Sequence, residues 1–189
     1  MKKALLLTAL LAAVGAAQAQ SATYKMDPSH TAVTFEARHF GTSTLRGRWD
    51  KKEGTITLDK AAKTGSVEFS LEMASLTTGT AAFDGHLKSN DFFAADQFPT
   101  AKFVGDKFTF NGDKLASVSG MLTLRDKTNP VTLTATNYNC YENPRLKREV
   151  CGGDFETTIQ RSQWGINYGL PMASPDAVHL LIQVEAIKQ

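Results

Sequence analysis

From residue 22 onward, hydrophobic and polar positions alternate along the chain in short runs that are separated by turn residues. The run at 30–38 is a clear example, with Val33 and Phe35 on the face opposite Thr34. A period of two residues is typical of β-strands that bury one face. No stretch of ten residues shows the spacing of an amphipathic helix. The pattern therefore predicts an all-β protein.

The strands are expected to follow one another as antiparallel neighbours, because the connections between them are short. Roughly eight or nine strands of this kind fit either a β-sandwich or a closed barrel. The cysteines lack the Cys–Trp–Cys order of immunoglobulin domains, and the inward positions are large and often aromatic. An eight-stranded barrel has an interior just wide enough for side chains or one small ligand. We therefore expect a single antiparallel eight-stranded β-barrel.

Turn residues predict where the strands are connected. Asn111-Gly112 is the strongest hairpin signal in the chain. Residues 51–54 end in a glycine and also indicate a hairpin turn. Residues 137–153, which contain both cysteines, are expected to form a long loop.

Residues 78–99 interrupt the alternation. The segment combines aromatic side chains with three charged or titratable ones: Phe83, Phe92, Phe93 and Phe98, with Asp84, His86 and Lys88. Irregular segments of about twenty residues are uncommon in compact domains and are often functional, and aromatic side chains need apolar surroundings. We therefore expect a short helical or irregular cap that acts as a lid on one end of the barrel.

The N-terminus has the order of a secretory signal peptide. Lys2 and Lys3 precede an apolar run over residues 4–17, and Ala17-Gln18-Ala19 is a small-x-small cleavage site. We expect cleavage of residues 1–19, which leaves one domain at 20–189 in the periplasm. A retained membrane anchor is the alternative, but the apolar run is short for a bilayer span.

The net charge and the cysteine content limit which partners and which kinds of site are expected. Lys and Arg number 21 and Asp and Glu 19, and Lys2 and Lys3 account for the difference. A mature chain of near-zero net charge lacks the concentrated basic surface that nucleic-acid binding requires. In an oxidising compartment, Cys140 and Cys151 most simply form a disulfide. A redox or metal pair is the alternative, although CxxC spacing and neighbouring histidines are missing.

The sequence offers little support for catalysis. Its four histidines are His30, His39, His86 and His179. They do not have metal-ligand spacing, and there is no nucleophile elbow, phosphate loop or nucleotide fingerprint. Asp84 and His86 have two interpretations: they pin the cap to the barrel rim, or they contact the head group of a ligand together with Arg161. We expect no metal, no cofactor and no enzymatic activity.

Four motifs follow one another along the chain: Tyr24-x-Met-Asp27-Pro-Ser-His30, Asp84-x-His86-Leu87-Lys88-Ser89-x-Asp91-Phe92-Phe93, Phe98-Pro99-x-Ala101-x-Phe103 and Arg161-Ser162-x-Trp164-Gly165-Ile166. Together they resemble the motifs of the YceI-like family of secreted proteins. The resemblance implies a lipocalin-like barrel with a long apolar pocket for an isoprenoid lipid, such as a polyprenyl chain or a quinone. Phe83 stands where the family often has Arg, and Trp164 where Phe is usual. A phenylalanine at position 83 favours an apolar contact there.

We therefore expect a periplasmic protein that holds an isoprenoid lipid for transport, storage or stress protection. The expected ligand-binding residues are Phe35, Trp49, Phe69, Phe83, Asp84, His86, Phe92, Phe93, Phe103, Leu122, Leu133, Arg161, Trp164 and Ile182. The inward-facing members of this set are equally compatible with a filled core. The sequence does not predict the oligomeric state.

Two other functions remain open. In the first, Asp84, His86 and Arg161 form an enzyme site that acts on a lipid phosphate or ester at the barrel mouth. In the second, the protein is an envelope adaptor whose basic run at 145–148 contacts anionic head groups or a partner. A transient contact with a membrane surface is compatible with either function and with the carrier.

Overall fold

The computed structural model describes residues 21–189, so the expected signal peptide at 1–19 lies outside the described residues. The described chain forms strands and a few short helical turns. The strands are β1 (Ala22–Met26), β2 (Ala32–His39), β3 (Ser43–Trp49), β4 (Lys52–Asp59), β5 (Thr64–Glu72), β6 (Leu76–Thr77), β7 (Thr100–Asn111), β8 (Lys114–Leu124), β9 (Lys127–Asn143), β10 (Arg148–Gln160) and β11 (Ala177–Lys188). The helical elements are α1 (Ala81–Lys88) and the 3₁₀ turns η1 (Met73–Ser75) and η2 (Arg161–Trp164).

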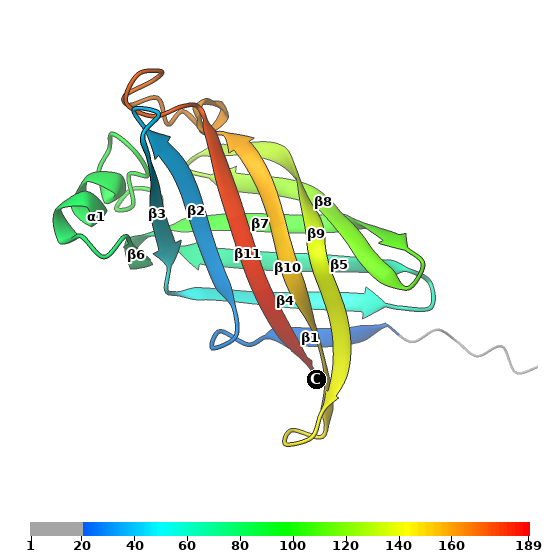
Figure 1. Cartoon of the computed structure of the whole chain (residues 1–189). Helices are drawn as coiled ribbons and strands as arrows, with labels where there is room; N and C mark the ends of the chain where they lie inside the picture. Colours follow the sequence, from blue (N-terminus) through cyan, green and yellow to red (C-terminus); the bar gives the residue numbers. More distant parts are fainter. Residues whose placement is uncertain (1–20) are drawn as a thin grey trace, which may run out of the picture.

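Eight of these strands close into an antiparallel barrel (Figure 1). The order around the barrel is β1-β4-β5-β7-β8-β9-β10-β11, and β1 pairs with β11 to complete it. In that closing pair, Tyr24 lies opposite Lys188 and Met26 opposite Ala186. The predicted all-β class and eight-stranded barrel are confirmed.

The remaining strands extend the sheet at one end of the barrel. β11 is long enough to hold two partners on one edge, because β1 pairs near its C-terminus and β2 pairs with residues 179–183. The turn at residues 27–31 carries the chain from one partner position to the other. β3 and β6 continue beyond β2, and Figure 1 places them next to α1.

The turn predicted at residues 51–54 is wrong. β4 already begins at Lys52 and pairs with β1 and β5, whereas β3 pairs with β2 and β6. Gly54 lies inside β4, where an added Cβ would come within 3.0 Å of the Glu68 carbonyl oxygen. The glycine therefore serves close packing against β5 and not a turn.

The loop predicted at residues 137–153 is also wrong, because β9 and β10 run through most of it. Only residues 144–147 connect the two strands. Cys140 and Cys151 lie directly opposite each other in the ladder and form the expected disulfide. Tyr138 and Cys140 continue the inward alternation of β9, a signal that the turn-forming asparagines and Pro144 obscured.

The tryptophan of η2 fixes that turn against the barrel wall. Trp164 is 1% exposed, and its indole Nε1 donates a hydrogen bond to the Leu122 carbonyl oxygen of β8 at 3.0 Å. Gly165 ends the turn in the left-handed conformation, with φ of 73°. Such a conformation favours glycine, and it directs the chain into the irregular segment before β11.

Candidate ligand-binding cavity

The barrel interior is hollow. It holds an inner chamber of about 160 Å³ and an outer chamber of about 230 Å³ beneath α1. One buried water needs only about 10–15 Å³ of such volume, so the inward side chains enclose a cavity rather than a filled core. The two chambers adjoin at a waist, which we define by the residues that line both: Val33, Leu71, Ala101, Leu122 and Leu180.

The inner chamber is lined by aliphatic and aromatic side chains from the barrel strands. Predicted members of this lining are Phe69, Phe103, Leu122, Leu133 and Ile182. They face inward because alternate residues of a strand point to the same side of the sheet. The residues between them are more exposed, as Val104 illustrates at 44% exposure beside the buried Phe103.

The outer chamber lies between the β2–β3 sheet and the segment at 78–99, which we call the lid. Phe83 and His86 from α1, together with Phe92 and Phe93, line it from the lid side. Phe35 and Trp49 line it from the sheet side. Because these side chains come from both sides, the lid and the sheet together enclose the chamber.

Trp49 is the contact between the sheet and the lid. Its ring centroid lies 5.7 Å from that of Phe93 at an interplanar angle of 75°, and 5.7 Å from that of Phe35. An edge-to-face pair of this kind contributes about 0.5–1.5 kcal/mol beyond its buried area. The buried Nε1 of Trp49 has no hydrogen-bond partner among the described residues.

Asp84 anchors the lid and does not line either chamber. Its carboxylate accepts hydrogen bonds from the amide nitrogen and the hydroxyl of Thr78, both at 2.6 Å. The hydroxyl bond is the main reason that the pKa of Asp84 lies below its ordinary value. The carboxylate also lies in the first turn of α1, where negative charge complements the helix dipole. Because Thr78 belongs to the lid itself, these bonds hold the start of α1 to the chain that leaves β6.

Three aromatic rings close the mouth of the outer chamber. His86 and Phe92 come from the lid, and Tyr168 comes from the segment before β11. The ring of His86 lies 5.0 Å from each of the other two, and those two lie 5.3 Å apart. Tyr168 was not predicted as a site residue, because it stands in an irregular stretch without alternation.

The Arg161 guanidinium is bonded to backbone carbonyl oxygens of the protein itself. The guanidinium donates to the carbonyl oxygens of Ile166 at 3.0 Å and Tyr168 at 2.9 Å. It also donates to those of Pro175 at 3.2 Å and Ser174 at 3.4 Å. Burial lowers the pKa of Arg161, against the opposing effect of the Asp176 carboxylate. These bonds hold the mouth segment in place, so Arg161 borders the outer chamber without offering it a free charge.

The structure therefore brings together all but two of the predicted ligand-binding residues. The exceptions are Asp84, which turns to Thr78, and Trp164, which supports β8 from outside the chambers. Within residues 21–189, no hydrogen bond or ion pair joins Asp84, His86 and Arg161, the three residues of the alternative enzyme site.

Residues 21–189 contain no group of three or more His, Cys, Asp or Glu side chains arranged to hold a metal ion. Over the same range, no helix has both the length and the apolar character to cross a bilayer. The basic run at 145–148 spans the β9–β10 connection and the first residue of β10, far from α1 (Figure 1).

Comparison with known proteins assigns the same architecture. A family model described as a YceI-like domain matches residues 24–186. A UPF0312 protein of Pseudomonas putida is 36% identical, with 96% of this chain and 93% of the relative covered. A UPF0312 protein of Pseudomonas aeruginosa is 35% identical over the full length of both chains.

Solved structures of lower sequence identity share the fold. BcnA of Burkholderia cenocepacia matches with a TM-score of 0.71 and 21% identity, over 85% of this chain and 98% of that one. A polyisoprenoid-binding domain from Saccharophagus degradans matches with a TM-score of 0.64 and 12% identity, over 88% and 98% of the two chains.

Proposed function

The chain belongs to the YceI-like family, and from this premise we propose that it is a binding protein for an isoprenoid lipid. The observation that carries the proposal is the two-chamber cavity, which runs through the barrel to a mouth covered by the lid. A polyprenyl chain or the tail of a quinone matches such a lining, because both are apolar and branched. The ligand class of the polyisoprenoid-binding domain with the same fold supports this choice.

Burial of the tail supplies the affinity. Each Å² of apolar surface removed from water contributes about 25 cal/mol, less the cost of ordering the chain. Since Arg161 is already bonded to backbone carbonyls, we assign recognition mainly to the tail. The head group then lies at the mouth, near His86 and Tyr168.

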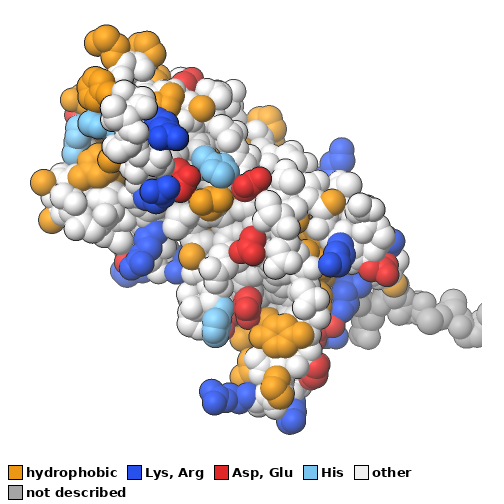
Figure 2. Space-filling model, in the orientation of Figure 1, with side chains coloured by type: hydrophobic (Ala, Val, Ile, Leu, Met, Phe, Trp, Pro, Cys, Tyr) orange, Lys and Arg blue, Asp and Glu red, His pale blue; other side chains and the backbone are white. Residues whose placement is uncertain are grey.

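The proposed setting is the periplasm, where the protein carries, stores or protects its lipid without chemical turnover. The signal-like N-terminus and the disulfide both support an oxidising compartment. A transient membrane contact is part of the proposal. We place it at the mouth, because Phe40, Tyr168 and Met172 are 61%, 50% and 79% exposed there. Figure 2 shows hydrophobic side chains gathered over this end of the molecule.

Organic extraction of the purified protein, followed by mass spectrometry, tests the proposal. We expect a co-purifying isoprenoid, and we expect the stripped protein to bind added geranylgeraniol more tightly than a straight-chain fatty acid of similar length. Tryptophan fluorescence reports this binding, because Trp49 lines the outer chamber. An extract free of isoprenoids, combined with no preference for the branched chain, would overturn the proposal.

A further inference from the structure

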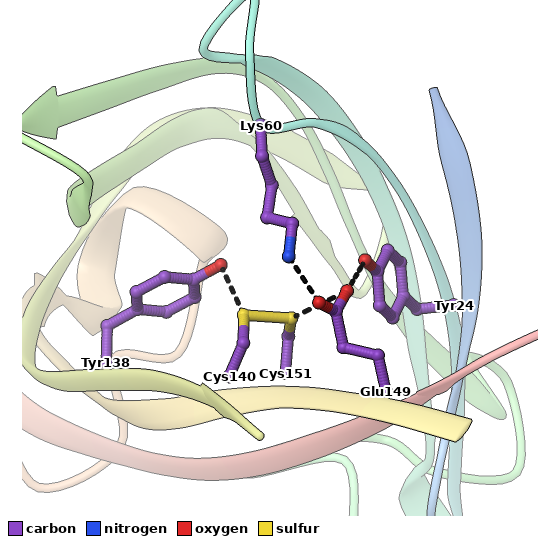
Figure 3. The surroundings of a disulfide bond; sticks show 6 residues. All are labelled: Tyr24, Lys60, Tyr138, Cys140, Glu149 and Cys151. Atoms are coloured by element: carbon purple, nitrogen blue, oxygen red, sulfur yellow. Dashed lines mark hydrogen bonds and ion pairs between the residues drawn. A yellow bond between two sulfur atoms is a disulfide. The ribbon is translucent and has the colours of Figure 1, made fainter. Parts of the chain in front are cut away.

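Beside the inner chamber, a set of polar side chains gathers around the disulfide (Figure 3). We call this set the floor, and it consists of Tyr24, Lys60, Tyr138, Glu149 and the Cys140–Cys151 disulfide. Tyr24, Tyr138 and Cys151 line the chamber directly. Glu149 and Lys60 lie behind them, with side chains 23% and 47% exposed to solvent. Tyr24, Tyr138 and Cys151 therefore lie between the chamber and the more exposed pair of Glu149 and Lys60.

The polar atoms of the floor bond to one another. The Tyr24 hydroxyl donates to Glu149, and the Lys60 ammonium pairs with the other oxygen of the same carboxylate. The hydroxyl of Tyr138 lies 3.3 Å from Cys140 Sγ. Because their polar ends are occupied in this way, these side chains present ring faces and sulfur to the chamber rather than free donors.

The negative charge of Glu149 strengthens the hydrogen bonds of the floor. Burial alone would raise the pKa of Glu149, but the hydrogen bonds from Lys60 and Tyr24 outweigh it and hold that pKa below its ordinary value. Burial and the Glu149 carboxylate together raise the pKa of Tyr24. Glu149 is therefore an anion bound by two donors, and removal of either donor would leave it partly buried and poorly compensated.

The floor is also cross-linked across the barrel. The disulfide joins β9 to β10, Glu149 joins β10 to β1 through Tyr24, and Lys60 adds the β4–β5 connection. The lid, in contrast, meets the opposite wall of the mouth through aromatic contacts. The cavity thus has one end held by cross-links between strands and one end covered by the lid and the segment before β11.

β11 gives the distance between these ends. Its inward residues run from Val178 in the outer chamber to Ala186 beside the floor. Eight residues of strand span about 26 Å, which corresponds to roughly 20 Å along the axis of a barrel with ordinary strand tilt. The length available to a chain inside the cavity is therefore fixed by the backbone.

We propose that the floor sets the length of isoprenoid tail that the protein accepts. This inference rests on the proposed function and adds a chain-length specificity to it. The tail enters below the lid, passes the waist and ends against Tyr24 and Tyr138. Additional isoprene units cannot advance without separating Glu149 from its partners, so they remain at the mouth and gain no burial.

Binding of a series of isoprenoid alcohols to the stripped protein tests the proposal. Alcohols with three to nine isoprene units are compared by competition and mass spectrometry. We expect affinity to rise with length and then to level off. In Tyr138→Ala the plateau should begin one unit later, because the deleted phenol is about as large as an isoprene unit. The first alcohol beyond the wild-type plateau should gain at least about tenfold in affinity.

Tyr141→Ala is the matched control, since Tyr141 lies on the same strand but is 43% exposed outside the barrel. Circular dichroism and thermal melting verify that each variant is folded, and Tyr138→Leu replaces Tyr138→Ala if the latter does not fold. An unchanged plateau in the folded variant would overturn the floor as a length stop. Failure of the wild-type protein to bind any of the alcohols would instead overturn the proposed function.

Discussion

The carboxylate of Asp84 and the hydroxyl of Thr78 lie 2.6 Å apart, and the same carboxylate accepts the Thr78 amide at 2.6 Å. This pair fixes the start of α1 to the chain that leaves β6. Asp84 was predicted to contact a ligand, but its carboxylate bonds within the lid instead. These bonds explain why a carboxylate stands beside an apolar cavity.

Asp84→Ala should loosen the lid without unfolding the barrel. The two Thr78 donors lose their ionised acceptor, so amides at 81–98 should exchange hydrogen at least about fivefold faster. Release of a bound isoprenoid should accelerate in parallel, while the melting temperature changes little. Asp96→Ala, an exposed site on the same segment, is the control. Equal exchange rates in the two variants would show that Asp84 is not the anchor.

Ala101→Leu should block the waist. Ala101 is 4% exposed, lines both chambers and lies opposite Leu71. Three added carbons would fill the passage, so long isoprenoid alcohols should lose about tenfold in affinity, while the shortest ones still occupy the outer chamber. Competition binding measures this change, with Val104→Leu on the outer face of β7 as the control. Undiminished affinity for the long alcohols would indicate that the tail does not pass the waist.

The turn between β1 and β2 should make stability depend on pH. The Asp27 carboxylate accepts hydrogen bonds from Ser29 Oγ at 2.6 Å and lies 2.8 Å from His30 Nδ1. These contacts, led by Ser29, lower the pKa of Asp27 to about 2, and Asp27 in turn raises the pKa of His30.

The signs of the two shifts define a pH window. The contribution of Asp27 is complete above about pH 4 and is lost as the pH falls through about 2. The contribution of His30 is complete below about pH 6.5 and is lost as the pH rises through its raised pKa. His30→Gln should therefore destabilise the protein more at pH 5 than at pH 8.5 in urea unfolding. His39→Gln, which removes a ring that packs edge to face against Phe40, is the control, and equal losses at both pH values in His30→Gln would contradict the assignment.

Replacing both cysteines should weaken the fold but preserve it. Cys140 and Cys151 are 11 residues apart in sequence, and closing a loop of this size contributes about 3 kcal/mol in the chain-entropy model. The Cys140→Ala, Cys151→Ala double variant should lose about that much free energy of unfolding in guanidinium. Reductant should bring the wild-type protein to the same value. If reductant leaves its unfolding unchanged, the disulfide does not constrain the unfolded chain.

The cavity lining could be predicted from the sequence wherever strict alternation holds. Phe35, Phe69 and Ile182 each occupy an inward position in a run of period two, and the side of the sheet follows directly from that period. The lid could be predicted because the alternation of hydrophobic and polar residues stops there while several phenylalanines remain.

Contacts that depend on chain topology could not be predicted. Lys60 and Glu149 are 89 residues apart in sequence, and no local pattern reports that the β4–β5 connection meets β10 at the floor. Arg161 was predicted to contact a ligand, because the irregular segment that follows it shows no pattern that would reveal its hydrogen-bond partners. The carbonyl oxygens that occupy it come from residues 166–175, and their directions follow from backbone angles that the composition does not encode.

The floor is cross-linked between strands, whereas the lid is held mainly by the Asp84–Thr78 bonds and by aromatic contacts. This difference affects how the protein can evolve. Under the proposed function, substitutions at Asp84 or Phe93 should alter how quickly the lipid enters and leaves, whereas substitutions at Tyr138 or Tyr24 should alter which chain lengths fit. Exchange rate and selectivity are then expected to depend on separate segments of the chain. Either one can be retuned, by natural drift or by engineering, while the other stays as it is.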